Sequence, residues 1–180
     1  MSADEHRGIL PGAVRQNGYI VRDLDAAIQS WLALGIGPWL TMRGVRQPGG
    51  FYRGAPSEPL LSIAFANSGD LQIELIQPDD ESPSIYREFL GSGHQGFHHL
   101  AWWADDFDAA MARASAAGWP VVQSSGPEAT ARFAYFEIGA AEPRIVEIME
   151  LNDLTRALGE AVRSAAAGWD GSEPAVRSIR

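Results

Sequence analysis

The sequence contains an internal repeat, and this repeat limits the possible folds more than any other feature. Residues 23–28 (DLDAAI) match residues 106–111 (DFDAAM) at an offset of 83 positions. Residues 71–76 (LQIELI) match residues 144–149 (RIVEIM) at an offset of 73 positions, so the second copy has a shorter middle. One short match can arise by chance, but two matches in the same order rarely do. The chain is therefore predicted to contain two copies of one structural unit.

Both copies predict the same order of elements, which is a strand, a helix and then three strands. Asp23 and Asp106 can cap the first turn of each helix, and Gly35 and Gly118 end the two helices. Apolar stretches bounded by Gly, Pro, Asn or Asp predict the strands. In the first copy these are residues 13–21 and 38–45 and a hairpin at 60–78, and in the second copy residues 97–104, 120–125, 131–139 and 143–151.

This order predicts an α+β fold made of two tandem βαβββ modules. A length of 180 residues fits a single domain, which we place at residues 13–151, with modules at 13–78 and 96–151. Residues 152–180 are expected to add a C-terminal helix and a polar tail. The Gly- and Pro-rich residues 47–59 are expected to form a loop.

Composition excludes several classes of function. The 23 acidic and 14 basic residues give a net charge of −9, which argues against nucleic acid or an anionic membrane as a partner. There is no cysteine, so disulfides, thiolate nucleophiles and cysteine-based metal sites are excluded. The N-terminus lacks the pattern of a signal peptide, and no apolar run approaches the roughly 18–20 residues of a membrane span. We expect a soluble, cytoplasmic protein.

The repeat places four polar residues at equivalent positions. The offset of 83 pairs Gln16 with His99, and the offset of 73 pairs Glu74 with Glu147. Each residue lies within an expected strand, and each can bind a metal ion through an amide oxygen, a carboxylate or an imidazole nitrogen.

The two glutamates point most strongly to a metal ion. Because side chains alternate along a strand, Glu147 shares its face with Ile145 and Met149, and Glu74 shares its face with Gln72 and Ile76. A carboxylate in such company is costly to bury unless a positive charge compensates it, and no lysine lies near either strand. A divalent cation is the simplest compensation.

Each residue taken alone has an ordinary structural explanation. A glutamate in a strand most often lies on a solvated face, and a single histidine in a strand is more often a hydrogen-bonded structural residue than a ligand. Equivalent positions in two copies favour a shared metal site over four independent accidents. His98 aligns with Arg15, and strand alternation predicts that it faces away from His99 and takes no part in the site.

The segments QNGYIVRDLDAAIQSW, LQIELIQP, HHLAWWADDFDAA and RIVEIME resemble the duplicated βαβββ modules of the vicinal oxygen chelate superfamily. Members include glyoxalase I, methylmalonyl-CoA epimerase, extradiol dioxygenases and bleomycin-resistance proteins. The resemblance covers about residues 13–151. It implies a cupped mixed sheet around a metal site, whose ligands come from the first and last strand of each module and are here Gln16, Glu74, His99 and Glu147.

The resemblance also bears on subclass. The ligand order Gln, Glu, His, Glu is similar to that of glyoxalase I, whereas the epimerases carry His at the position of Gln16. Residues 58–67 look more like the epimerase branch, in which a glutamate at the position of Glu58 is one of two catalytic bases. Extradiol dioxygenases need two histidines and one carboxylate around iron, so Gln16 makes that chemistry the least favoured.

The resulting prediction is a metal-dependent isomerase, epimerase or lyase that removes a proton beside a metal-bound carbonyl and passes through an enolate. The donor set suits zinc, nickel, cobalt or manganese. Glu147 or Glu58 is the expected base, the substrate is a small molecule with neighbouring oxygens, and the family implies a homodimer. The alternative is a non-catalytic protein that binds small molecules, as in the drug-resistance branch.

Overall fold

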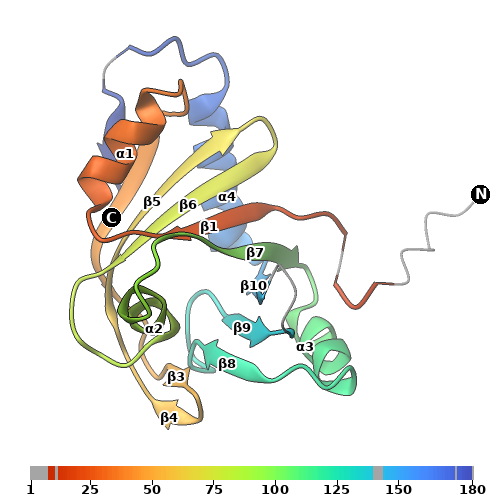
Figure 1. The fold of residues 1–180 in the computed structure, drawn as a ribbon. Coiled ribbons are helices and arrows are strands. Elements are labelled where there is room, and N and C mark those ends of the chain that lie inside the picture. The colour runs from red at the N-terminus through yellow and green to blue at the C-terminus, as the bar shows by residue number, and fades with distance from the viewer. Residues whose placement is uncertain (1–7, 11, 140–143, 173, 180) are drawn as a thin grey trace, which may run out of the picture.

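The computed structural model describes residues 8–10, 12–139, 144–172 and 174–179 (Figure 1). Its helices are α1 (Leu24–Leu32), α2 (Ile85–Gly91), α3 (Phe107–Ala116) and α4 (Asp153–Ala166). Its strands are β1 (Gln16–Ile20), β2 (Trp39–Arg46), β3 (Phe51–Tyr52), β4 (Ala55–Pro56), β5 (Leu60–Ser68), β6 (Leu71–Pro78), β7 (Gly96–Ala104), β8 (Val121–Ser124), β9 (Phe133–Glu137), β10 (Ile145–Glu150) and β11 (Val176–Ser178). No helix in these ranges is long and apolar enough to cross a membrane.

All the strands belong to one curved sheet in the order β11-β2-β5-β6-β1-β7-β10-β9-β8-β3-β4 (Figure 1). β1 and β7 are antiparallel neighbours at its centre, and each is flanked on its outer side by a parallel strand, β6 or β10. Beyond these, β5 and β2 on one side correspond to β9 and β8 on the other. The predicted α+β fold with two βαβββ units is confirmed.

The register at the centre of the sheet obeys the offset read from the sequence. Gly18 on β1 lies opposite His99 on β7, and Gln16 lies opposite Ala101. Adding 83 to Gly18 gives Ala101, and subtracting 83 from His99 gives Gln16, so the offset converts the first pair into the second. The pairing of β1 with β7 therefore relates the two copies by an approximate two-fold axis, which places Gln16 and His99 in equivalent surroundings.

Each copy covers the outer face of its own half of the sheet with a helix. α1 packs on β5 and β6 through a cluster that includes Leu24, Ile28 and Trp39. α3 packs on β10 through a cluster that includes Phe107 and Ile148. Both helices start as predicted, because the Asp23 and Asp106 carboxylates each accept a hydrogen bond of 2.9 Å from the backbone N–H three residues on.

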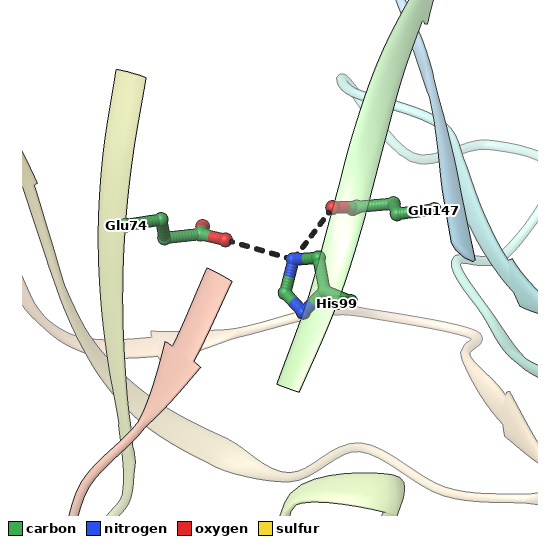
Figure 2. A group of neighbouring side chains, drawn as sticks. All are labelled: Glu74, His99 and Glu147. Carbon is green, nitrogen blue, oxygen red and sulfur yellow. Dashed lines mark ion pairs between the residues drawn. The ribbon is translucent and has the colours of Figure 1, made fainter. Parts of the chain in front are cut away.

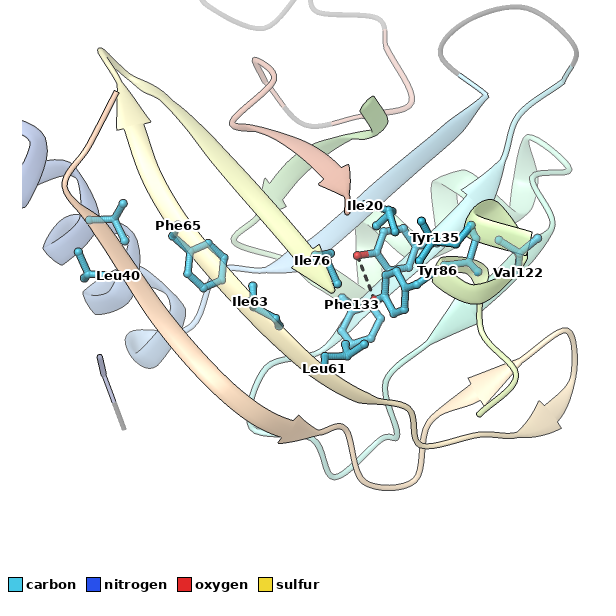
Figure 3. Packing of buried hydrophobic residues seen from close by; sticks show 13 residues of the cluster. Ile20, Leu40, Leu61, Ile63, Phe65, Ile76, Tyr86, Val122, Phe133 and Tyr135 are labelled. Atoms are coloured by element: carbon cyan, nitrogen blue, oxygen red, sulfur yellow. Dashed lines mark hydrogen bonds between the residues drawn. The ribbon is translucent and has the colours of Figure 1, made fainter. Parts of the chain in front are cut away.

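The inner face of the sheet carries a third apolar cluster, which α2 and α4 cover (Figure 3). It joins Phe65 and Ile76 of the first copy to Phe133 and Tyr135 of the second. α4 packs across β5 and β6 on the face opposite α1 and buries Val162 completely. The C-terminal helix therefore fills part of the cup.

Two segments differ from their prediction. Residues 47–59 contain the hairpin of β3 and β4, which leaves the first copy and pairs with β8 of the second. The expected polar tail contains β11, which pairs in parallel with β2 and extends the opposite edge of the sheet. The strands β3 and β11 are short and join the sheet through partners that lie far away in sequence, so local patterns do not reveal them.

Candidate metal centre

Strands β6, β7 and β10 bring Glu74, His99 and Glu147 together on the inner face of the sheet (Figure 2). His99 Nε2 lies 3.5 Å from Glu74 Oε2 and 3.2 Å from Glu147 Oε2. One potential ligand atom from each residue lies within 4.8 Å of the other two. His99 is fully buried, and Glu74 and Glu147 are 8% and 5% exposed. The result is a buried cluster of one imidazole and two carboxylates.

Sheet register explains why these residues meet. Glu74 on β6 lies beside Gly18, which lies opposite His99, and Glu147 on β10 lies beside Ala101, two residues from His99 on β7. Gly18 and Ala101 have little or no side chain, so the longer side chains on either side extend over the centre of the sheet toward each other. The sequence repeat correctly predicted this equivalence of Glu74 and Glu147.

Gln16 contributes a fourth polar group on the same face. It is buried, and its Nε2 donates a hydrogen bond of 2.7 Å to Gln72 Oε1. This bond orients the amide and leaves Gln16 Oε1 buried, with no hydrogen-bond partner among the described residues. Gln72 was not predicted as part of the site, although the alternation that places it on the face of Glu74 was the available signal.

The chemistry of the unpartnered atoms tests whether a metal ion fits. Gln16 Oε1, Glu74 Oε2, His99 Nε2 and Glu147 Oε2 are all buried and lack a hydrogen bond within the described residues. Buried polar groups almost always have partners, so a group of such atoms on one face requires an explanation. Each of the four is a metal-ligating atom, and a divalent cation would satisfy all of them. The donor set therefore fits a metal ion.

The electrostatics of the cluster point the same way. Burial lowers the pKa of His99, but the carboxylates of Glu147 and Glu74 outweigh it and raise the pKa to about 9. Burial raises the pKa of Glu74, and the neighbouring His99 offsets part of that rise. A protonated His99 is thus the positive charge that the two carboxylates hold when no cation is bound, and a bound cation would take the place of that proton.

Gly18 is required by the close approach of His99. A Cβ atom added at Gly18 would lie 1.8 Å from His99 Cε1 and 2.1 Å from Nε2, which no real structure tolerates. The ring therefore lies directly over the backbone of β1. Sequence reasoning missed Gly18, and a glycine inside an otherwise regular strand was the signal that marks such an approach.

Glu58 lies apart from this cluster. It is exposed, and its Oε1 accepts a hydrogen bond of 2.7 Å from the backbone N–H of Gly49. It precedes β5 and lies seven positions before Phe65, the partner of Glu74 on that strand. The structure does not bring the predicted second base together with the other site residues.

His98 differs from its prediction. The pairing of β1 with β7 shifts so that Gly18 and Tyr19 lie opposite His99 and Phe97, and His98 is left as the extra residue of a β-bulge. A bulge interrupts strand alternation. His98 is consequently buried beside His99, with 3.0 Å between their Nδ1 atoms. The expectation that His98 faces away was wrong because alternation does not hold there.

Two cavities adjoin the inner face on either side of the cluster. One of about 510 Å³ lies next to His98 and Ile145, and its other lining residues include Arg53, Phe89, Phe97 and Arg144. The other, of about 570 Å³, lies between α4 and the start of β1, and its lining residues include Arg15, Asn67, Trp103, Gly159 and Arg163. Both volumes are within the range of small-molecule sites.

Comparison with known families identifies one match. Residues 15–136 match the family model described as Glyoxalase/Bleomycin resistance protein/Dioxygenase superfamily. A comparison with curated proteins finds no significant match.

Several solved structures share the fold. A hypothetical protein from Bacillus halodurans C-125 is 19% identical, with a TM-score of 0.60 over 78% of this chain and 95% of that one. Methylmalonyl-CoA epimerase from Mycobacterium tuberculosis is 22% identical, with a TM-score of 0.54 over 80% of this chain and 91% of that one. A Streptomyces coelicolor methylmalonyl-CoA epimerase variant in complex with 2-nitronate-propionyl-CoA is 18% identical, with a TM-score of 0.53 over 78% and 94%.

Proposed function

The chain belongs to the Glyoxalase/Bleomycin resistance protein/Dioxygenase superfamily, and we propose that it is a metal-dependent isomerase, epimerase or lyase acting on a small carbonyl compound. The observation that supports this proposal is the group of buried ligand atoms on Gln16, Glu74, His99 and Glu147, none of which has a hydrogen bond within the described residues. A protein that only sequesters a small molecule has no need of two buried carboxylates around one imidazole.

In this proposal those four side chains hold one divalent cation. One nitrogen and three oxygen donors suit zinc, nickel, cobalt or manganese. When bound, the cation supplies Lewis-acid chemistry to a substrate with neighbouring oxygens and makes the hydrogen beside its carbonyl more acidic. Gln72 holds the amide of Gln16 so that its oxygen, and not its NH₂ group, is free to bind.

Glu147 is the proposed base. Its Oε2 is buried and lies 3.2 Å from His99 Nε2, so it can take a proton from the carbon beside the carbonyl, exchange it with solvent and then return a proton to the substrate. Return of a proton to a neighbouring atom gives isomerisation, whereas epimerisation needs a second acid on the opposite face of that carbon. Glu58 is less suited to this role, because it is exposed and already accepts a hydrogen bond from Gly49. The cavity beside His98 and Ile145 is the proposed route for the substrate.

Deuterium exchange tests the proposal without knowledge of the substrate. Protein purified without a metal-binding tag is analysed for bound metal, then incubated in D₂O with carbonyl compounds that carry a neighbouring oxygen. Methylmalonyl-CoA is included because epimerases for it share the fold. We expect a stoichiometric divalent metal and catalysed exchange beside the carbonyl, with Glu147→Gln about 10²–10⁴-fold slower.

Glu58→Gln is the matched comparison, since it makes the same change at an exposed glutamate. We expect it to keep the exchange rate of the natural protein. Loss of exchange in Glu58→Gln but not in Glu147→Gln would return the base role to Glu58. Protein that binds small molecules but holds no metal and catalyses no exchange would be a binding protein, and the proposal would be wrong.

A further inference from the structure

His98 and His99 are joined by a side-chain contact that a regular strand does not allow. Their Nδ1 atoms lie 3.0 Å apart, and their rings cross at 87°. Neighbouring residues in a regular strand point to opposite faces, but the bulge at His98 turns both histidines inward. Bulges next to functional sites often redirect a side chain in this way.

We propose that His98 is a positioning residue for the metal centre. Its Nδ1 accepts a hydrogen bond from the Nδ1–H of His99 and holds the opposite nitrogen of His99, Nε2, toward Glu74 and Glu147. The proposal rests on the proposed metal site, and it adds to that site a residue that is not a ligand.

The direction of this hydrogen bond follows from the position of the metal-binding atoms. Two ring nitrogens at 3.0 Å must share one hydrogen, so one donates and the other accepts. Nε2 is the nitrogen of His99 that faces the carboxylates, at 3.2 and 3.5 Å. A neutral imidazole that binds a cation through Nε2 keeps its hydrogen on Nδ1. His99 therefore donates, and His98 accepts with its hydrogen on Nε2.

The surroundings of His98 hold it in place for this role. Its ring packs against Phe89 at 5.0 Å, Tyr135 at 6.3 Å and Tyr86 at 6.5 Å between centroids. Within the described residues, its hydrogen-bond partner is His99 alone. A purely structural histidine in this aromatic enclosure would be replaceable by an apolar ring, whereas a positioning histidine would not. Removing a residue that hydrogen-bonds to a metal ligand and orients it commonly weakens metal affinity by about 10–100-fold.

Two substitutions separate these roles. His98→Phe keeps the ring and its packing but removes the acceptor. His98→Asn is smaller and packs less well, but its amide oxygen is bonded to Cγ, as Nδ1 is in histidine, and can accept the same hydrogen bond. Phe89→Leu serves as the control, because it disturbs the packing on His98 and leaves its contact with His99 intact.

Two measurements are made on all four proteins at one fixed pH. Competition with a chelator gives the Zn²⁺ affinity, and ¹⁵N-detected spectra of Zn²⁺-loaded, histidine-labelled protein show which nitrogen of His99 carries hydrogen. We expect His98→Phe to bind Zn²⁺ about 10–100-fold more weakly and to lose the single His99 tautomer. His98→Asn should recover most of the affinity, and Phe89→Leu should resemble the natural protein.

The proposal is overturned if His98→Phe keeps the natural affinity and tautomer, or if His98→Asn binds more weakly than His98→Phe. The second result would assign the whole effect to packing. Failure of the proposed metal site would look different, since the natural protein itself would then bind no Zn²⁺. In that case the proposal would be overturned together with the metal site on which it rests.

Discussion

At the residue scale, the space between β1 and the His99 ring decides what position 18 can carry. The Cε1 and Nε2 atoms of His99 lie where the Cβ of any other residue would stand. Ala101 occupies the equivalent position in the second copy and has a Cβ, but the residue opposite it is Gln16, whose side chain is flexible. The difference between glycine and alanine at these two positions therefore follows from the difference between histidine and glutamine opposite them.

Gly18→Ala is predicted to displace His99 and weaken the metal centre. Forcing a methyl group into a packed interior commonly costs about 1–3 kcal/mol, and here the group that must move is a proposed ligand. We expect a lower free energy of unfolding and at least about tenfold weaker Zn²⁺ binding. Denaturant unfolding and chelator competition measure the two effects.

Gly91→Ala is the matched control, because an added Cβ at Gly91 meets no atom within 4 Å. It should leave both quantities near their natural values. Natural Zn²⁺ affinity in Gly18→Ala would show that the ring of His99 is not fixed where the structure has it.

The residues of the candidate site that occupy repeated positions could be predicted from the sequence, whereas the position of His98 could not. Glu74 and Glu147 are found from their equivalent positions, and the structure places them together around His99. His98 was misjudged because a bulge depends on how two distant strands pair, and one strand's sequence does not contain that information. The ligand roles themselves remain predictions.

At the element scale, Arg132 joins α3 to the end of β10. Its guanidinium binds Glu150 at 2.6 Å and Asp108 at 2.8 Å, and it lies 4.7 Å from the centre of the Phe107 ring. Arg132 and Glu150 are partly buried, whereas Asp108 is mostly exposed. The hydrogen bond from Arg132 lowers the pKa of the Glu150 carboxyl. This cluster links α3, the helix of the second copy, to β10, the strand that carries the proposed ligand Glu147.

Arg132→Gln is predicted to destabilise the fold by about 1 kcal/mol near neutral pH. Because the pKa of Glu150 is lowered in the folded state, its contribution is complete above the ordinary glutamate pKa and is lost as pH falls through the lowered value. The difference between natural protein and variant should shrink on acidification. Urea unfolding at a series of pH values measures it.

Arg156→Gln provides the comparison, since Arg156 pairs with an exposed carboxylate, Asp105. Its cost should stay below about 0.5 kcal/mol at every pH. An Arg132→Gln effect that is equally small, or that grows on acidification, would contradict this account of the cluster.

Helices were easier to predict than edge strands. α1, α3 and α4 begin at capping side chains that are visible in the sequence, including the capping box of Asn152 and Thr155 at α4. β3, β4 and β11 have two or three residues each, and β3 and β11 depend on distant partners, β8 and β2. The packing of α4 into the cup likewise depends on a partner, the apolar inner face of β5 and β6, rather than on its own sequence pattern.

At the scale of the whole molecule, metal binding and folding should be linked. The proposed ligands come from β1, β6, β7 and β10, so the unfolded chain does not hold them together. A cation that binds only the folded state stabilises it by about 2.7 kcal/mol at a concentration 100 times its Kd. We expect Zn²⁺ to raise, and a chelator to lower, the midpoint of thermal unfolding.

The His99→Gln variant, with one proposed ligand changed, should show a much smaller shift. Equal shifts in the two proteins would place the stabilising ion elsewhere on the chain. The expected homodimer and cytoplasmic location stay predictions, because nothing in a single chain decides either.

Gly18, which lies opposite His99, also determines which halves of this protein can pair with each other. If two copies of the second half paired through β7 in the observed register, Ala101 of each would stand where Gly18 stands and its methyl group would strike the histidine ring. Two copies of the first half would avoid that conflict but would bring together only glutamines and glutamates. An imidazole between two carboxylates therefore arises only when unlike halves meet. Although the two halves repeat one structural unit, Gly18 makes them complements that cannot replace each other.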